Sequence, residues 1–176
     1  HQEHTGGTMN EAALLSGIKT ELIAQLWTGS PNVVFPTGSV AIVPSVADAL
    51  PQALNTMRVP FCLIEPGAAE SDPVHDEEPD FERFNPNLII LTAIPGDVLG
   101  ENAVVGANKT GGDTVSEGRG ILELEQELYN AVGKLNALES ITLQVRQKGQ
   151  QGAVRKIPSE WIVYRIYSLE SWGTAV

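Results

Sequence analysis

The residue types that could carry chemistry in this sequence are a single cysteine and a histidine that stands among acids. Cys62 lies inside the apolar run VPFCLIE, where a small core residue is the expected role. His75 has Asp72, Asp76 and two further acids close by, and carboxylate and imidazole groups are suitable metal ligands. Their spacing matches neither an EF-hand nor HExxH, so we expect a solvated loop there rather than a metal site.

A Gly-Arg-Gly triplet at residues 118–120 is the second candidate. It precedes an expected helix, where backbone amides and the guanidinium of Arg119 can bind an anion, although a plain turn into the helix explains the triplet as well. The sequence has neither a GxxxxGK[ST] phosphate-binding loop nor a GxSxG nucleophile elbow. We therefore expect no enzyme activity, no catalytic residue, no cofactor and no bound metal.

Charge is distributed unevenly along the chain. The 22 acidic and 11 basic residues give a net charge of −11, which argues against sequence-independent binding of nucleic acid, because such binding neutralises phosphates. The segment from Glu65 to Arg83 has one base and eight acids, namely Glu65, Glu70, Asp72, Asp76, Glu77, Glu78, Asp80 and Glu82. The segment from Gln144 to Lys156 has no acid and four bases, namely Arg146, Lys148, Arg155 and Lys156. These opposite charges can meet across copies of the chain, and solvated loops are the alternative.

Length and composition predict one globular domain. A chain of 176 residues with 42% apolar residues can bury a core of its own. Residues 1–8 (HQEHTGGT) precede Met9 and are expected to be an extension, so the domain is predicted over residues 9–176. No apolar run approaches the roughly 18 to 20 residues that span a bilayer, which predicts a soluble protein with no membrane partner.

The spacing of apolar residues predicts the helices that would position any site. Thr8 and Glu11 resemble a capping box, followed by a helical stripe made of Leu15, Ile18, Leu22 and Leu26. A second helix is predicted from a stripe made of Ile121, Leu124, Leu128, Val132 and Leu135. Its polar side is made of Glu123, Gln126, Glu127, Asn130 and Lys134. A short helix near residues 46–54 is expected to be interrupted at Pro51.

The strands complete the predicted fold. Residues 59–65 and 87–94 are dense apolar runs that predict buried, neighbouring strands, and residues 95–120 predict a long irregular loop. Alternation over residues 141–146 and the aromatic run 161–169 predict an antiparallel hairpin with its tip at residues 149–152. The expected class is α/β (α+β), with a small mixed or antiparallel sheet packed against two main helices, a C-terminal β-hairpin and long loops.

This order of elements resembles the tail terminator proteins of long-tailed bacteriophages. The resemblance rests on residues 59–64 with the acidic loop after them, and on residues 87–94, 119–135 and 140–172. It is an arrangement of elements and not a diagnostic motif. It implies a structural virion protein, located in the tail or neck and made in the cytoplasm of the bacterial host.

The resemblance also implies partners. Such a protein forms a homo-oligomer, a ring of six copies, on the last ring of the tail tube protein, ends tail polymerisation and presents a face to the head-to-tail connector or head completion protein. DNA passes through the channel without specific binding, which an acidic chain favours because like charges repel. The candidate interface residues are Arg146, Lys148, Arg155, Lys156, Arg119, Asp76, Glu77, Glu78 and Asp80.

Other functions remain open from the sequence. One alternative is another neck or minor tail component of a phage. Another is an adaptor domain that binds one peptide through a sheet edge, and a third is a small enzyme of unknown substrate that uses His75 or one of the acids.

Overall fold

The computed structural model describes residues 10–67, 69–71, 81–95, 99–106, 118–138, 142–147, 151–157 and 160–174. Within them the chain forms the helices α1 (Glu11–Ala24), α2 (Val46–Thr56), α3 (Glu101–Val105) and α4 (Ile121–Leu138). The strands are β1 (Val40–Ile42), β2 (Phe61–Glu65), β3 (Ala69–Ser71), β4 (Phe81–Phe84), β5 (Asn87–Pro95), β6 (Thr142–Gln147), β7 (Gln151–Ile157) and β8 (Glu160–Thr174). Helices packed on one mixed sheet confirm the α+β class, while the division between an extension and a domain stays a prediction, since residues 1–9 are not described.

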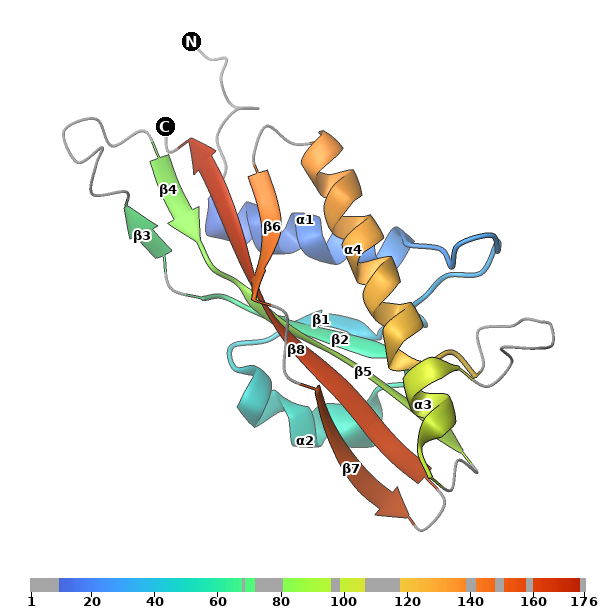
Figure 1. Cartoon of the computed structure of the whole chain (residues 1–176). Coiled ribbons are helices and arrows are strands. Elements are labelled where there is room, and N and C mark those ends of the chain that lie inside the picture. The colour runs from blue at the N-terminus through green and yellow to red at the C-terminus, as the bar shows by residue number, and fades with distance from the viewer. Residues whose placement is uncertain are drawn as a thin grey trace.

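The long strand β8 forms the centre of the sheet (Figure 1). Its first part pairs with β5 on one edge and β7 on the other, and its last part pairs with β4 and β6 in the same way. Beyond β5 come β2 and then β1, which is parallel to β2, whereas the other pairs are antiparallel. Residues 160–165 of β8 are thereby held between β5 and β7.

The strands β4 and β5 behave as one strand with a short break. Their pairing with β8 keeps the same register on both sides of the break, from Phe84 opposite Ser171 to Asn87 opposite Ser168. The chain of β2 and β3 bends beside this break at Gly67, where an added Cβ would lie 1.5 Å from the carbonyl oxygen of Asn85. Only glycine allows this close approach of two backbones.

Helices cover both faces of the sheet. In β2, Cys62 and Ile64 face the core shared with α1 and α4, whereas Phe61 and Leu63 face the core shared with α2. This is why the run is apolar at every position rather than alternating. The prediction that residues 59–65 and 87–94 form neighbouring buried strands is confirmed, and so is the core position of Cys62, which is 0% exposed.

The two main helices form as predicted, with differences at the start and end of α1. The N-cap is Asn10, whose side-chain oxygen accepts a hydrogen bond from the amide of Ala13 at 2.8 Å, so the predicted pairing of Thr8 with Glu11 is wrong. The helix ends at Ala24, and Leu26 lies beyond it with 42% of its surface exposed. Leu26 instead pairs with Val33 in a short antiparallel bridge.

Helix α2 continues through Pro51 to Thr56, so the expected interruption is absent. Its apolar residues pack against the sheet, and this contact outweighs the hydrogen bond that proline cannot make. The start of α2 is well capped, because the Ser45 side chain accepts from the amide of Asp48 at 3.2 Å. The Glu65 carboxylate at the end of β2 also accepts from the amide of Val46 at 2.6 Å.

The C-terminal hairpin has its turn in a different place from the prediction. Residues 149–152 are not its tip, because β7 begins at Gln151 and Gly152 already pairs with Tyr164 of β8. The turn lies between Ile157 and Glu160, and β6 and β7 together line one edge of β8. The hydrogen bonds between paired strands come from backbone groups, so glycine and glutamine can take part in them. The Tyr164 ring lies over Gly152, which has no side chain.

The expected loop over residues 95–120 is not irregular throughout. Helix α3 forms within it and packs against α4, β5 and β8, while residues 96–98 and 107–117 lie outside the described residues.

Candidate functional site

Glu125 of α4 lies at the centre of a buried polar cluster. It is 6% exposed, and its Oε2 accepts hydrogen bonds from the Tyr167 hydroxyl at 2.5 Å and from the Arg165 guanidinium at 2.8 Å. Both donors come from β8, and the Tyr129 ring meets the Tyr167 ring edge to face with centroids 6.3 Å apart. The cluster therefore fixes α4 against the central strand of the sheet.

The packing of this cluster sets the protonation state of its two tyrosines and its arginine. Burial raises the pKa of Tyr167, and the hydrogen bond and charge of Glu125 raise it further. Burial and the Glu125 charge also raise the pKa of Tyr129. For Arg165, burial lowers the pKa, but the hydrogen bond and charge of Glu125 outweigh burial, so the net change is upward. The two phenols stay protonated and the guanidinium stays charged at neutral pH.

Glu127 is the second buried carboxylate of α4 and is 4% exposed. It accepts from the Thr28 amide at 2.8 Å, the Thr28 hydroxyl at 2.9 Å, Gln25 Nε2 at 2.9 Å and Asn130 Nδ2 at 3.0 Å. Burial raises the pKa of Glu127, but these four hydrogen bonds together outweigh burial and hold the pKa below its ordinary value. The ionised side chain thus anchors the turn after α1 to α4.

Neither carboxylate is arranged for catalysis. A general base needs a free lone pair that a substrate can reach, and both groups are buried among donors supplied by the protein itself. The Cys62 thiol is also buried, and burial raises its pKa. The hydrogen bonds of the two carboxylates hold α4 to β8 and to the turn after α1.

Sequence reasoning missed the burial of both acids. Glu127 was placed on the polar side of the helix, whereas the structure buries it beneath the turn that contains Thr28. Glu125 follows Ile121 by four residues and precedes Leu128 by three, so it falls on the apolar stripe. A glutamate at a helix position where apolar residues recur was the signal that could have identified Glu125 as buried.

Arg119 lies at the start of α4, next to Trp27. Its guanidinium carbon lies 4.7 Å from the centroid of the Trp27 ring, and Nη1 pairs with Glu123 at 3.2 Å. The amide of Gly120 also donates to Glu123, at 3.1 Å. An anion bound at this helix start would have to displace the Glu123 carboxylate, which favours a plain turn into the helix.

The predicted basic residues do not all come together. Arg155 pairs with Trp161 near the start of β8, and Lys156 is next to it in β7. Arg146 lies in β6 about seven residues farther along β8, which is roughly 23 Å in an extended strand. Lys148 lies outside the described residues. The start of β8 is therefore one basic end of the sheet, and Arg146 belongs to its middle.

Strands β3 and β4, which flank residues 72–80 in the sequence, lie at the opposite end of the sheet. The chain leaves β3 at Ser71 and enters β4 at Phe81, which pairs with Thr174 at the end of β8 (Figure 1). Residues 72–80 lie outside the described residues, including the predicted interface acids Asp76, Glu77, Glu78 and Asp80 and the candidate ligand His75. The strands that flank residues 72–80 thus lie at the end of the 15-residue strand β8, and Arg155 and Lys156 of β7 lie at its start.

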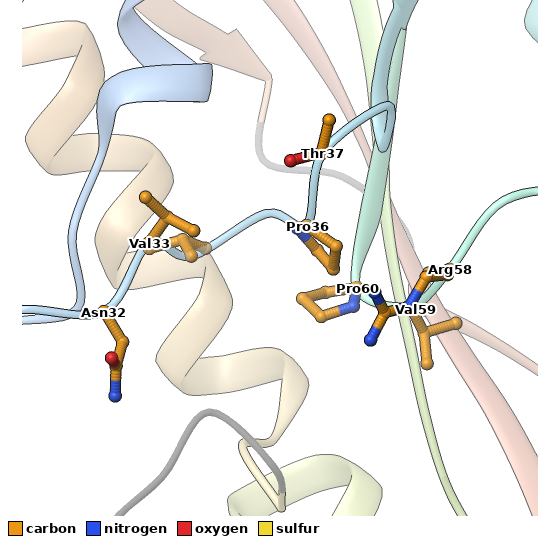
Figure 2. A pocket seen from close by; sticks show the side chains of 8 residues that line it. Asn32, Val33, Pro36, Thr37, Arg58, Val59 and Pro60 are labelled. Atoms are coloured by element: carbon orange, nitrogen blue, oxygen red, sulfur yellow. The ribbon is translucent and has the colours of Figure 1, made fainter.

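A solvent-open pocket of about 410 Å³ lies between residues 32–37 and residues 58–60. Figure 2 shows the side chains of Pro36 and Pro60 between Val33 on one side and Arg58 and Val59 on the other. The two segments are tied together because the Ser39 hydroxyl donates to the Arg58 carbonyl at 2.7 Å. Sequence reasoning did not single out this pocket, since its walls are far apart in the chain.

Within the described segments, no three His, Cys, Asp or Glu side chains come close enough to hold a metal ion. No helix there is long and apolar enough to cross a bilayer. Comparison with protein-family models and with curated proteins finds no match for this chain.

Proposed function

We propose that this chain is a structural virion protein that caps the tail tube of a long-tailed bacteriophage as a ring of six copies. The ring ends tail polymerisation and forms the interface to the head-side connector. The α+β architecture agrees with this proposal, because the described residues have two main helices on one mixed sheet and a C-terminal hairpin. The net charge of −11 also suits a channel through which DNA passes without sticking.

The observation that carries the proposal is the separation of charge along β8. Arg155 and Lys156 lie at its start, and the strands that lead into the acidic segment lie at its end. The two ends of one 15-residue strand are up to about 45 Å apart, so they cannot pair within one copy. They can pair head to tail between neighbours, which is the contact that closes a cyclic ring.

The buried polar groups support a structural role as well. Glu125 and Glu127 are fully used in holding α4, and neither faces the open pocket. Opposite charges at the two ends set register and orientation between copies, while apolar contacts supply most of the affinity.

The test is mass and shape together. Light scattering over a concentration series, followed by negative-stain imaging, should show particles of about 113 kDa, six times 18.8 kDa, that appear as open rings. If the chain stays a monomer, it should still cap purified tail tubes, because the tube then templates the ring. A chain that forms no ring and caps no tube is not a terminator.

A further inference from the structure

The pocket between residues 32–37 and 58–60 has a cation that the fold does not use. The carbonyl of Arg58 accepts a hydrogen bond from Ser39, but within the described residues its guanidinium has no hydrogen bond or ion pair. Arg58 is also solvent-exposed. It is therefore free to bind a carboxylate that comes from outside the described fold.

Part of the pocket lining is aliphatic, and an exposed leucine lies beside it. Val33 and Val59 are 45% and 39% exposed, and Leu26, opposite Val33 in the antiparallel bridge, is 42% exposed. Trp27 N donates to Asn32 O, and the bridge places the Leu26 and Val33 side chains on the same face. With Pro36 and Pro60 on the floor, the surface suits a segment that combines apolar residues with acids.

This chain has such a segment. Residues 72–80 (DPVHDEEPD) contain two prolines and a valine, together with five acids and no lysine or arginine. Prolines restrict the backbone toward extended conformations, which lowers the entropy lost when the segment docks on an apolar groove. The acids supply the negative counter-charge that the Arg58 guanidinium does not have among the described residues.

The segment cannot reach the pocket of its own copy. Phe61, beside the pocket, pairs with Leu91 of β5, which pairs in turn with Tyr164 of β8. Phe81, where β4 begins, pairs with Thr174 of β8. Ten residues of strand separate Tyr164 from Thr174, or about 33 Å. Nine residues anchored at both ends extend at most about 17 Å from their anchors. An occupant with this sequence must come from another copy.

We propose that this pocket receives residues 72–80 of the neighbouring copy, with Arg58 pairing with their carboxylates and Val33 and Val59 packing against Pro73, Val74 and Pro79. The inference rests on the proposed ring and names the contact that closes it. The surface of each copy that receives this segment thus includes Arg58 as well as Arg155 and Lys156 of β7.

The first test is binding of a labelled peptide that spans residues 71–81 to the full chain, followed by fluorescence anisotropy. Arg58→Glu should weaken binding by about five-fold or more, while Lys19→Glu on α1 leaves it unchanged. A peptide with Glu77→Gln and Glu78→Gln should also bind more weakly to the wild-type chain. Equal binding to the wild-type and Arg58→Glu chains, at unchanged melting temperatures, overturns the inference.

The second test is a charge exchange between copies. Arg58→Glu alone and Asp76→Lys/Glu77→Lys/Glu78→Lys alone should each fail to form rings, because every contact then pairs like charges: the triple variant has three lysines against Asp72 and Asp80 in its segment. A one-to-one mixture should form rings again, since each pocket meets a segment of opposite charge. Rings formed by Arg58→Glu alone refute the pocket contact and leave the proposed function standing. Failure of the wild-type chain to form rings or cap tubes refutes the function, and the peptide titration then decides the pocket by itself.

Discussion

Glu127 on α4 and Arg58 before β2 are both charged, but their surroundings are opposite. Glu127 is 4% exposed and accepts four hydrogen bonds, whereas Arg58 is exposed and its guanidinium has no partner among the described residues. A buried charge is tolerated only when it is matched within the fold, while an exposed charge can wait for a partner. We therefore expect Glu127 to contribute to stability, and Arg58 to contribute to the assembly that we propose.

Replacing Glu125 should produce the largest loss of stability. Glu125→Gln removes the charge that Arg165 faces at 2.8 Å and leaves a single amide oxygen to accept from Arg165 and the Tyr167 hydroxyl. Because the partly buried Arg165 then loses the ion pair with Glu125, we expect a loss of about 3 kcal/mol in the free energy of unfolding. Urea denaturation measures it, with the exposed Glu101→Gln as control, and a loss equal to that of the control contradicts the role given to Glu125.

Two glycines of the α4 region should respond in opposite directions to the same substitution. In Gly120→Ala the new Cβ would lie 2.5 Å from backbone atoms of Val104 and Gly106, so we expect a loss of about 2 kcal/mol. In Gly133→Ala nothing lies within 4 Å of the new Cβ, and alanine favours the helix, so we expect a gain of about 0.8 kcal/mol. Thermal melts of both variants decide this, and a shift of the same sign in both would refute the packing described at Gly120.

The lowered pKa of Glu127 predicts a pH dependence. Its hydrogen bonds favour the ionised form in the folded state, so its contribution is present above the ordinary value of 4.5 and is lost as the pH falls through the folded pKa. Glu127→Gln should be less stable at pH 7, and its stability should fall less steeply below pH about 5. Urea midpoints across this range measure the two slopes, and identical slopes would show that Glu127 has no such role.

Reversing charge at the basic end of the sheet should affect stability least. Arg155→Glu with Lys156→Glu is expected to leave the melting temperature nearly unchanged, because in the proposed ring these charges pair with a neighbouring copy rather than within the fold. The same variant should weaken ring assembly in light scattering, whereas Lys19→Glu should assemble normally. A large drop in melting temperature would make Arg155 and Lys156 structural and would remove the contrast between core and ends.

Most of the fold could be predicted from the sequence because its strongest patterns are local. The stripe from Ile121 to Leu135 is long enough to predict α4, and residues 59–65 and 87–94 are dense enough to predict buried strands. The hairpin turn was misplaced because the Gly-Gln segment resembles a loop, whereas the backbone of Gly152 joins the ladder under the Tyr164 ring.

The candidate site was harder to predict. Arg155 and Lys156 could be identified from the run of bases, but Arg58 is a single arginine between apolar residues and carries no local signal. Its proposed role depends on a pocket whose two walls are far apart in the chain and are joined by the hydrogen bond from Ser39 to the Arg58 carbonyl.

The sequence by itself determined which segments are helical, which are buried and where the charge lies, because propensity, apolar period and composition act over short stretches. Tertiary structure alone decided that Glu125 and Glu127 are partners of β8 and of the turn after α1. It also decided that Arg155 and Lys156 of β7 lie beside the start of β8, whereas the strands that flank residues 72–80 lie beside its end. Pairings between residues far apart in the chain depend on strand register and packing, and no local pattern encodes them.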